Sequence, residues 1–247
     1  MKALTRAAYL VYEICIALPI ILVATILTAI VTIIGGVFGN PDFWGYYPGM
    51  IWSRIICKSL LLPVTVTGQE NIETGRPYII VANHQSAFDI FLLYGYIGIR
   101  FKWLMKKELA RIPLVGTACT KAGFIYIDRS SRVNSMGSID KAAETLQHGM
   151  SMAIFPEGTR SADGRMGRFK KGAFLLAEDL MIPVLPVTIG GAFEVMSKHS
   201  KTVSWHPLSL TIHEPIQPTD MSGLDETEKN NAIKALAIKA ENAIGGN

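Results

Sequence analysis

The chain has 247 residues, enough for one core domain with an appendage, and 49% of them are hydrophobic against 18% charged, which is more apolar than usual for a soluble domain. Its net charge of +4 and scattered lysines and arginines argue against a nucleic-acid binder and suit a small anionic substrate or an anionic membrane surface. Cys15, Cys57 and Cys119 are widely spaced, so neither a disulfide framework nor a zinc site is expected.

The N-terminal part contains an uncharged stretch, residues 14–41, that runs for 28 residues. About 20 apolar residues are enough to cross a bilayer, so this stretch predicts a membrane segment. A cleaved signal peptide would have an apolar core of about 7 to 15 residues and an A-x-A-like site, and neither condition holds. Pro19 and the pair Gly35 and Gly36 could kink a helix here, so a single span and a re-entrant hairpin both fit the sequence.

The next segment, residues 50–62, places Arg54 and Lys58 four positions apart among isoleucines and leucines, after an aromatic stretch at residues 43–48. This pattern predicts either a basic amphipathic helix on lipid headgroups or a first helix packed on the following domain. Residues 1–62 are therefore predicted to be a helical membrane anchor, and residues 63–247 are predicted to form one further domain.

Beyond residue 62 the chain alternates short β-rich runs with longer stretches that are compatible with helix. The β-rich runs are residues 64–67, 78–82, 101–105, 124–128, 152–155, 184–189 and 209–213. The helix-compatible stretches include residues 134–147, 171–179 and 225–244. This alternation predicts an α/β fold with a central, mostly parallel mixed sheet flanked by helices.

A histidine and an aspartate follow the second β-rich run, in residues 83–89 (NHQSAFD). His84 comes just past the end of the run, at the edge of a sheet where ligands tend to bind. Asp89 can meet it if His84 lies in the turn and Asp89 one turn into the next helix, with Ser86 as the N-cap. A carboxylate that holds an imidazole in this way produces a general base. No partner serine is evident, so the nucleophile is expected to be a substrate hydroxyl; the alternative is a helix-capping histidine beside a solvated aspartate.

Residues 155–161 (FPEGTRS) also follow a β-rich run and combine a carboxylate, a glycine and a guanidinium. Arg160 carries the planar fork that pairs bidentately with phosphate, and Glu157 can hydrogen-bond the hydroxyl of an acceptor. Gly158 and Thr159 lie between them. Taken alone, each of these residues could equally belong to an exposed turn.

Two further blocks complete the pattern. Lys106 and Lys107 begin the first, which ends at Arg129 after the letters GFIYID. These cations add positive charge, although most lysines and arginines are simply solvated. The second block, residues 182–187 (IPVLPV), is apolar and is expected to line a core or a lipid-facing groove.

In this order the four blocks resemble those of the lysophosphatidic acid acyltransferase family, the PlsC-like 1-acyl-glycerol-3-phosphate acyltransferases. NHQSAFD has the pattern N-H-x-S-x-x-D, KKEL with the later GFIYIDR matches the second block, FPEGTRS the third and IPVLPV the fourth. The blocks extend over residues 83–187, whereas residues 1–62 and 190–247 match only in general character. The resemblance implies a glycerolipid acyltransferase fold, with the acyltransferase catalytic domain in residues 63–247.

For the site, the resemblance implies that His84 is the general base and Asp89 its orienting carboxylate, with no acyl-enzyme and no metal. It also implies a set of residues that bind the acceptor's phosphate and glycerol: Lys106, Arg129, Glu157, Gly158 and Arg160. Weaker candidates, placed only by adjacency, are Lys107, Thr159, Ser161 and Lys170.

The implied reaction moves an acyl group from acyl-CoA or acyl-ACP, each a co-substrate, to the free hydroxyl of 1-acyl-glycerol-3-phosphate. The product would be phosphatidic acid, and no bound cofactor is expected. The expected partners are a lysophospholipid, an acyl thioester, the lipid bilayer and acyl carrier protein, with no nucleic acid. The expected location is the cytoplasmic membrane, with the active site facing the cytoplasm. Three alternatives stay open: a related enzyme using glycerol 3-phosphate, another lysophospholipid or a lyso-aminolipid; a membrane-anchored hydrolase; and a non-catalytic lipid-binding protein.

Overall fold

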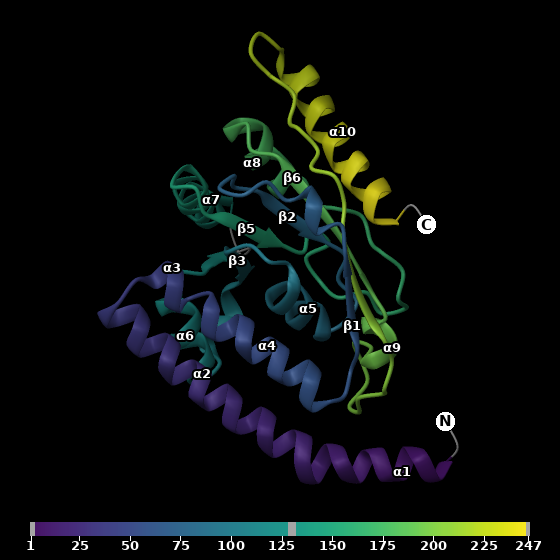
Figure 1. The fold of residues 1–247 in the computed structure, drawn as a ribbon. Helices are drawn as coiled ribbons and strands as arrows, with labels where there is room; N and C mark the ends of the chain where they lie inside the picture. The colour runs from purple at the N-terminus through teal and green to yellow at the C-terminus, as the bar shows by residue number, and fades with distance from the viewer. Residues whose placement is uncertain (1–2, 128–131, 246–247) are drawn as a thin grey trace.

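The computed structural model describes residues 3–127 and 132–245. These residues form a seven-stranded sheet with helices packed around it (Figure 1). The strands lie in the order β1-β7-β6-β2-β5-β3-β4. Every neighbouring pair is parallel except β6 and β7, which are antiparallel. The strands are β1 (Val64–Thr67), β2 (Ile79–Ala82), β3 (Phe101–Lys106), β4 (Ile125–Ile127), β5 (Ser151–Ile154), β6 (Val184–Gly190) and β7 (Leu208–Ile212). The predicted α/β fold with a mostly parallel mixed sheet is therefore confirmed.

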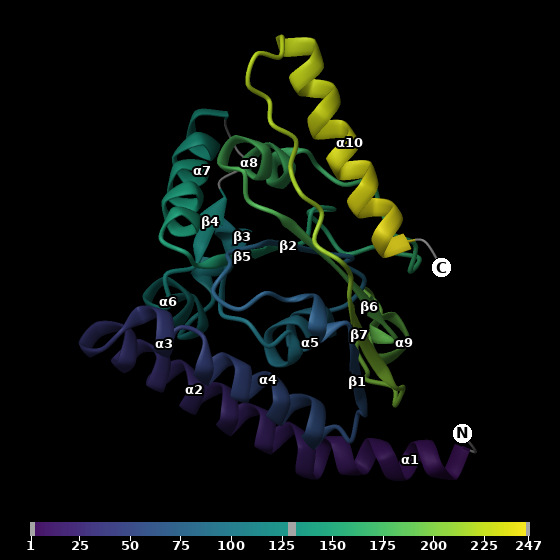
Figure 2. The same ribbon diagram turned by 45° about the horizontal axis from the view of Figure 1, so that its top comes forward.

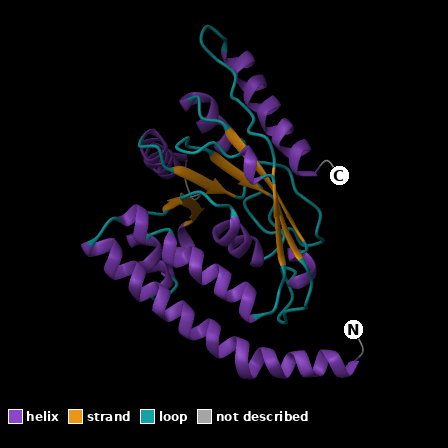
Figure 3. Cartoon of the chain, in the orientation of Figure 1, coloured by secondary structure: helices purple, strands orange, loops and turns teal. Residues whose placement is uncertain are grey.

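Helices cover both faces of the sheet (Figures 2 and 3). One face packs against α4 (Tyr47–Ser59) and α5 (Phe88–Tyr96), and the other against α7 (Arg132–Gln147), α8 (Gly172–Leu180) and α10 (Glu226–Gly245). All four residues of β2 are buried, and alternate ones belong to the two different cores. Because successive side chains of a strand point to opposite faces, a strand covered on both sides is apolar throughout.

The predicted membrane segment is one long helix with a bend near its N-terminal end (Figure 1). It consists of α1 (Ala3–Tyr12), a π-helical turn (Glu13–Ala17) and α2 (Leu18–Phe38). Pro19 has no N–H to donate, and the chain accommodates it by widening the preceding turn, in which the Leu18 N–H donates to the Glu13 carbonyl. Prolines and π-turns are common causes of helix bends, so Pro19 acts as expected.

The glycine pair of this helix serves close packing instead of a kink. A Cβ atom on Gly35 would lie 2.2 Å from the Trp44 ring, and one on Gly36 would lie 2.5 Å from the carbonyl oxygen of Lys121 in α6 (Val115–Lys121). The helix runs through both glycines to Phe38. The sequence left a kink at Gly35 and Gly36 open, and the structure shows a continuous helix there, in which these positions bring neighbouring segments close to the helix.

After α2 the chain turns through α3 (Pro41–Trp44) and returns as α4, which lies between α2 and α5. The buried positions of α4 include Gly49 and Ser53, and a Cβ atom on Gly49 would lie only 2.3 Å from the Tyr94 ring. Arg54 donates from Nε to the Gly95 carbonyl at 2.7 Å. Of the two interpretations of residues 50–62, the structure supports a helix packed on the following domain, and both ends of this helix lie three residues earlier than predicted.

A buried lysine joins the turn of the N-terminal segment to the sheet. Lys102 of β3 is 5% exposed and its Nζ donates to the carbonyl oxygens of Pro41 and Ala122 at 3.0 and 2.7 Å. The same Nζ lies 3.0 Å from a carboxylate oxygen of Asp42. Burial lowers the pKa of Lys102, and the carboxylate beside it opposes that shift. Three oxygen partners thus hold a charged group where solvent is excluded.

Candidate active site

The site is built at the carboxyl end of β2, where Asn83 extends the pairing between β2 and β6. Its side-chain amide donates to the Ile189 carbonyl at 2.9 Å and accepts from the Ile189 N–H at 2.8 Å. Asn83 is 4% exposed. The first residue of the NHQSAFD block therefore fixes the chain direction at the point where His84 leaves the sheet.

His84 and Asp89 are in direct contact, as their spacing predicts. The Nδ1 atom of His84 lies 2.8 Å from Oδ2 of Asp89, whose side chain is 0% exposed. The same oxygen accepts hydrogen bonds from the N–H groups of Gln85 and Ser86 at 2.6 and 2.8 Å. A carboxylate only accepts hydrogen bonds, so Nδ1 is the donor of this contact and Nε2 is the ring nitrogen that does not face Asp89.

The helix start differs in detail from the prediction. Helix α5 begins at Phe88 with Ala87 as its N-cap, so Asp89 lies in the first turn and Ser86 lies outside the cap position. The Ser86 hydroxyl accepts from the Phe88 N–H at 3.1 Å and donates to the Met196 carbonyl at 2.7 Å. The Ser86 hydroxyl therefore makes the capping bond that was expected of it, one residue before the assigned cap position, while Asp89 accepts from the N–H groups before the helix.

The imidazole is also held by stacking. Its ring lies parallel to that of Phe155, with centroids 4.0 Å apart and planes 7° apart, and the His84 side chain is 16% exposed. Trp103 packs behind Phe155 with its ring centroid at 5.5 Å. An aromatic face on one side and a carboxylate on Nδ1 restrict the ring to one orientation. Phe155 opens the FPEGTRS block but was not among the predicted site residues.

Glu157 braces the loop that carries His84. Its Oε1 accepts from the His84 N–H at 2.6 Å, and its Oε2 accepts from the Gly167 N–H at 2.7 Å. The residue is 7% exposed, and burial raises the pKa of its carboxyl group while the two N–H donors oppose the rise. Both oxygens thus have main-chain partners, which favours a positioning role over the predicted contact with an acceptor hydroxyl.

The turn after Glu157 is tied to the same loop. Gly158 has a φ of +76°, a left-handed conformation that favours glycine, and its N–H donates to the Phe155 carbonyl at 3.0 Å. The Ser161 N–H donates to the His84 carbonyl at 2.8 Å. This bond places residue 161 beside residue 84 and brings the partly exposed Arg160 and the exposed Thr159 to the same end of the sheet.

The other predicted cations lie along that edge, toward β4. Lys106 is exposed at the end of β3, and its partner in the ladder is Ile127 at the end of β4. Lys107 begins the adjoining 3-10 turn, and Lys170 is exposed after the turn that follows β5. Arg129 lies outside the described residues. Lys106 and Arg160 thus follow two adjacent strands, β3 and β5, beside the strand that carries His84.

The thiol of Cys119 is not poised for nucleophilic attack. Burial raises the pKa of the Cys119 thiol to about 11. The thiolate is the reactive form of cysteine, so this group is almost entirely protonated at neutral pH. The geometry instead shows an imidazole oriented by a carboxylate, at a sheet edge with cations following the neighbouring strands.

Sequence comparison assigns the fold and this site to a class. Residues 63–190, just over half of the chain, match the family model described as Acyltransferase, and the chain belongs to this acyltransferase family. The similar proteins are more specific. The chain is 32% identical over 175 residues to a chloroplastic 1-acyl-sn-glycerol-3-phosphate acyltransferase of Brassica napus, covering 70% of this chain and 51% of that protein. It is 30% identical over 196 residues to a 1-acyl-sn-glycerol-3-phosphate acyltransferase of Saccharomyces cerevisiae, covering 78% and 64%.

A solved structure agrees with these matches over nearly the whole chain. The 1-acyl-sn-glycerophosphate acyltransferase PlsC of Thermotoga maritima superposes with a TM-score of 0.73 at 28% identity, covering 98% of this chain and 97% of that one. The chain spans about half to two thirds of the length of the curated relatives named above. The family resemblance drawn from the four sequence blocks is therefore confirmed.

Proposed function

We propose that this protein transfers a fatty acyl group from a thioester to the free hydroxyl of 1-acyl-glycerol-3-phosphate, giving phosphatidic acid. The observation that carries the proposal is the 2.8 Å contact between His84 Nδ1 and Asp89 Oδ2, which leaves Nε2 as a base beside exposed cations. The names of the similar proteins support this choice of acceptor.

In the proposed reaction Nε2 of His84 takes the proton of the acceptor hydroxyl, and the oxygen attacks the thioester carbonyl. The negative charge of Asp89 stabilises the imidazolium that forms. When the tetrahedral intermediate collapses, the carbon–sulfur bond breaks and His84 returns its proton to the leaving sulfur. The acyl group ends on the acceptor oxygen, and the free thiol leaves. General-base catalysis contributes about 10²- to 10⁴-fold, which suits a thioester that is already activated.

The acceptor's phosphate would be bound by the cations that follow β3, β4 and β5: Lys106, Arg129 and Arg160. Arginine pairs bidentately with phosphate, whereas lysine acts as a compact point charge. Glu157 keeps His84 in place through its main chain. Gly158 and Thr159 shape the turn between Glu157 and Arg160 and lie next to the glycerol in this arrangement.

The long N-terminal helix would hold the enzyme at its lipid substrate. Residues Arg6–Phe38 form a helix long and apolar enough to cross a membrane, with 11% of its most apolar window buried. However, the helix is fixed along the side of the domain, since Tyr12 and Trp52 make hydrogen bonds that link it to α4. Crossing the bilayer would draw the domain into the lipid, so we infer that the helix lies along the cytoplasmic membrane surface, where cytoplasmic thioesters reach the site.

The test is an acyl-transfer assay with the purified full chain in lipid nanodiscs. Lysophosphatidic acid and an acyl thioester should give phosphatidic acid, which is detected by mass spectrometry. His84→Ala should abolish this transfer. His148→Ala, which changes an exposed histidine just after α7, is the control and should leave the transfer unchanged. Wild-type turnover by His84→Ala would refute the mechanism. A panel with glycerol 3-phosphate, other lysophospholipids and a lyso-aminolipid identifies the acceptor.

Two arginine variants test the phosphate site in the same assay. Arg160→Ala should raise KM for acceptors that carry a phosphate monoester, because it removes the guanidinium beside the base. Arg100→Ala is the matched control, since Arg100 is an exposed arginine just before the N-terminal end of β3, whereas the site lies at the carboxyl ends of the strands. Unchanged kcat and KM for Arg160→Ala would remove Arg160 from the site.

A further inference from the structure

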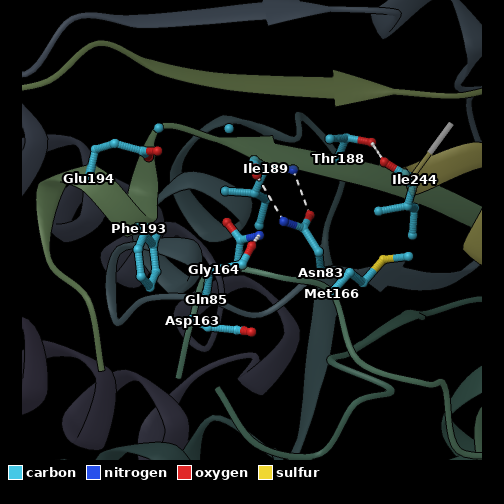
Figure 4. Close-up of a pocket in the computed structure, with 13 residues that line it drawn as sticks. Asn83, Gln85, Asp163, Gly164, Met166, Thr188, Ile189, Phe193, Glu194 and Ile244 are labelled. Carbon is cyan, nitrogen blue, oxygen red and sulfur yellow. Dashed lines mark hydrogen bonds between the residues drawn. The ribbon is translucent and has the colours of Figure 1, made fainter. Parts of the chain in front are cut away.

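A polar cavity of about 520 Å³ lies beside the His84 loop, at the carboxyl ends of β2 and β6 (Figure 4). This volume is within the range of about 300 to 1,000 Å³ that is typical of small-molecule sites. Its walls include Asn83, Gln85, Gly164, Met166, Phe193 and Glu194. Asn83 and Gln85 flank His84 in the chain, so the cavity is adjacent to the proposed base without containing it.

The strand order places the β6 wall of this cavity on the other side of β2 from β5 and β3, while the loop after β5 that carries Arg160 continues into the cavity wall at Asp163, Gly164 and Met166. Along the sheet, β2 lies between β6 on one side and β5, β3 and β4 on the other. Lys106 and Arg160 follow β3 and β5, whereas the cavity is bounded by the end of β6 and by Gly190 and Gly191 that follow. Two substrates must meet at His84. If the acceptor's headgroup occupies the β5 side, the β6 side is left for the donor.

The lining of the cavity suits a neutral, extended group that carries amides. Gln85 donates from Nε2 to the Gly164 carbonyl at 2.6 Å, which leaves its Oε1 able to accept a hydrogen bond. Gly190 and Gly191 offer main chain without side chains, and Phe193 and Met166 provide apolar surface. This combination matches a chain of amides and methyl groups.

Charge argues against a phosphate inside the cavity. Asp163 and Glu194 both line it, and like charges at close range are repulsive. The Arg165 side chain is 90% exposed between two lining residues, Gly164 and Met166, and its Nε lies 4.0 Å from an Asp163 oxygen. Arg168 is exposed three residues further along. Positive charge is thus found at the rim, where a phosphate at the end of an inserted arm would lie.

We propose that this cavity holds the pantetheine arm of the acyl thioester donor. The inference rests on the proposed function. Pantetheine is an extended chain of two amides with a gem-dimethyl group, it ends in the sulfur that carries the acyl group, and it is common to coenzyme A and acyl carrier protein. In coenzyme A and in acyl carrier protein the arm carries a phosphate at the end remote from the sulfur, and this end corresponds to the arginine rim.

The experiment compares two tryptophan variants of the full-length protein. Glu194→Trp fills the cavity from an exposed position, and Glu70→Trp is the matched control at an exposed glutamate of a distant 3-10 turn (Gln69–Asn71). Acyl transfer to lysophosphatidic acid is measured with donors that carry the same acyl chain on coenzyme A, carrier protein, pantetheine or N-acetylcysteamine. The last donor lacks most of the arm.

Glu194→Trp should raise KM for the three pantetheine-bearing donors about tenfold or more. It should leave KM for lysophosphatidic acid and the rate with the N-acetylcysteamine thioester unchanged, and Glu70→Trp should behave as wild type throughout. The proposal is overturned if KM for lysophosphatidic acid rises instead, or if all four donors lose activity equally.

A binding measurement separates this proposal from the proposed function. Saturation-transfer difference NMR with pantetheine itself should show signal from the gem-dimethyl protons with wild type and Glu70→Trp, but not with Glu194→Trp. Wild type that binds pantetheine but transfers no acyl group would refute the function and keep the cavity. Absence of the signal with wild type would refute the cavity whatever the turnover.

The source of the arm is read from a charge-reversal variant. The double variant Arg165→Glu and Arg168→Glu should raise KM for the donors on coenzyme A and on carrier protein, because both carry a phosphate at the end of the arm, and the donor with the larger rise is assigned as the source. The unphosphorylated pantetheine thioester should be unaffected. Equal weakening of that thioester would show that the rim arginines do not act on the phosphate.

Discussion

Replacing Asp89 with asparagine separates the charge of this residue from its geometry. One oxygen, Oδ2, accepts from His84 Nδ1 and from the N–H groups of Gln85 and Ser86. An asparagine oxygen at that place can accept all three hydrogen bonds. The opposite orientation of the amide is disfavoured, because it would turn the NH₂ group toward three N–H donors. Asp89→Asn therefore keeps the His84 tautomer and removes only the negative charge.

The expected loss follows from the distance. A unit charge pair about 4 Å apart at an effective dielectric constant near 20 interacts by about 4 kcal/mol. Because the proton is only partly on His84 in the transition state, about 2 to 4 kcal/mol of this is lost, or roughly 30- to 1,000-fold in kcat. KM for both substrates should change little, since neither needs the imidazolium to bind.

The assay is steady-state formation of phosphatidic acid, accompanied by thermal unfolding of each variant. Asp179→Asn, at an exposed aspartate of α8, is the matched control and should leave both kcat and the unfolding midpoint unchanged. Asp89→Asn with kcat within about threefold of wild type would refute the electrostatic reasoning. A fall in kcat that is matched by loss of folded protein would instead assign a structural role to the carboxylate.

Three further predictions concern buried polar groups. Glu157→Gln keeps one oxygen but leaves either the His84 or the Gly167 N–H without an acceptor. The free energy of unfolding, measured by denaturant titration, should therefore fall by about 1 to 3 kcal/mol. The kcat measured in the transfer assay should fall as well. Lys102→Met should lower stability by a similar amount and increase amide hydrogen exchange in residues 39–46. Burial lowers the pKa of His213, so its stabilising contribution is present above pH 6.5 and is lost as pH falls through the lowered pKa. His213→Gln should therefore show a smaller loss of stability on acidification, measured by unfolding at pH 5 and 7.

The link through Lys102 connects the N-terminal helical segment to the sheet. Asp42 and Pro41 lie in the turn between α2 and α4, and Lys102 lies in the strand whose far end carries Lys106. A rigid β-strand therefore connects the base of the helical segment to the predicted phosphate site. Loosening this contact is expected to alter how the site is held relative to the lipid surface.

The order of strands and helices and the contact between His84 and Asp89 were predictable because they depend on neighbours in the chain. Alternating apolar runs determine which segments form strands and helices. His84 and Asp89 are only five positions apart, so one turn of the chain brings their side chains together. The apolar helix, in the same way, is encoded by composition alone.

The partners that hold the site were decided only by the tertiary structure. Glu157 reaches the His84 N–H across 73 residues, and Phe155 stacks on the ring because β5 lies beside β2. The sequence block suggested that the Glu157 carboxylate is available to the substrate. Its actual direction depends on where the loop after β5 brings the Gly167 N–H back to it. Strand order and register set such contacts, and these follow from the packing of the whole sheet, which no short segment of the sequence contains.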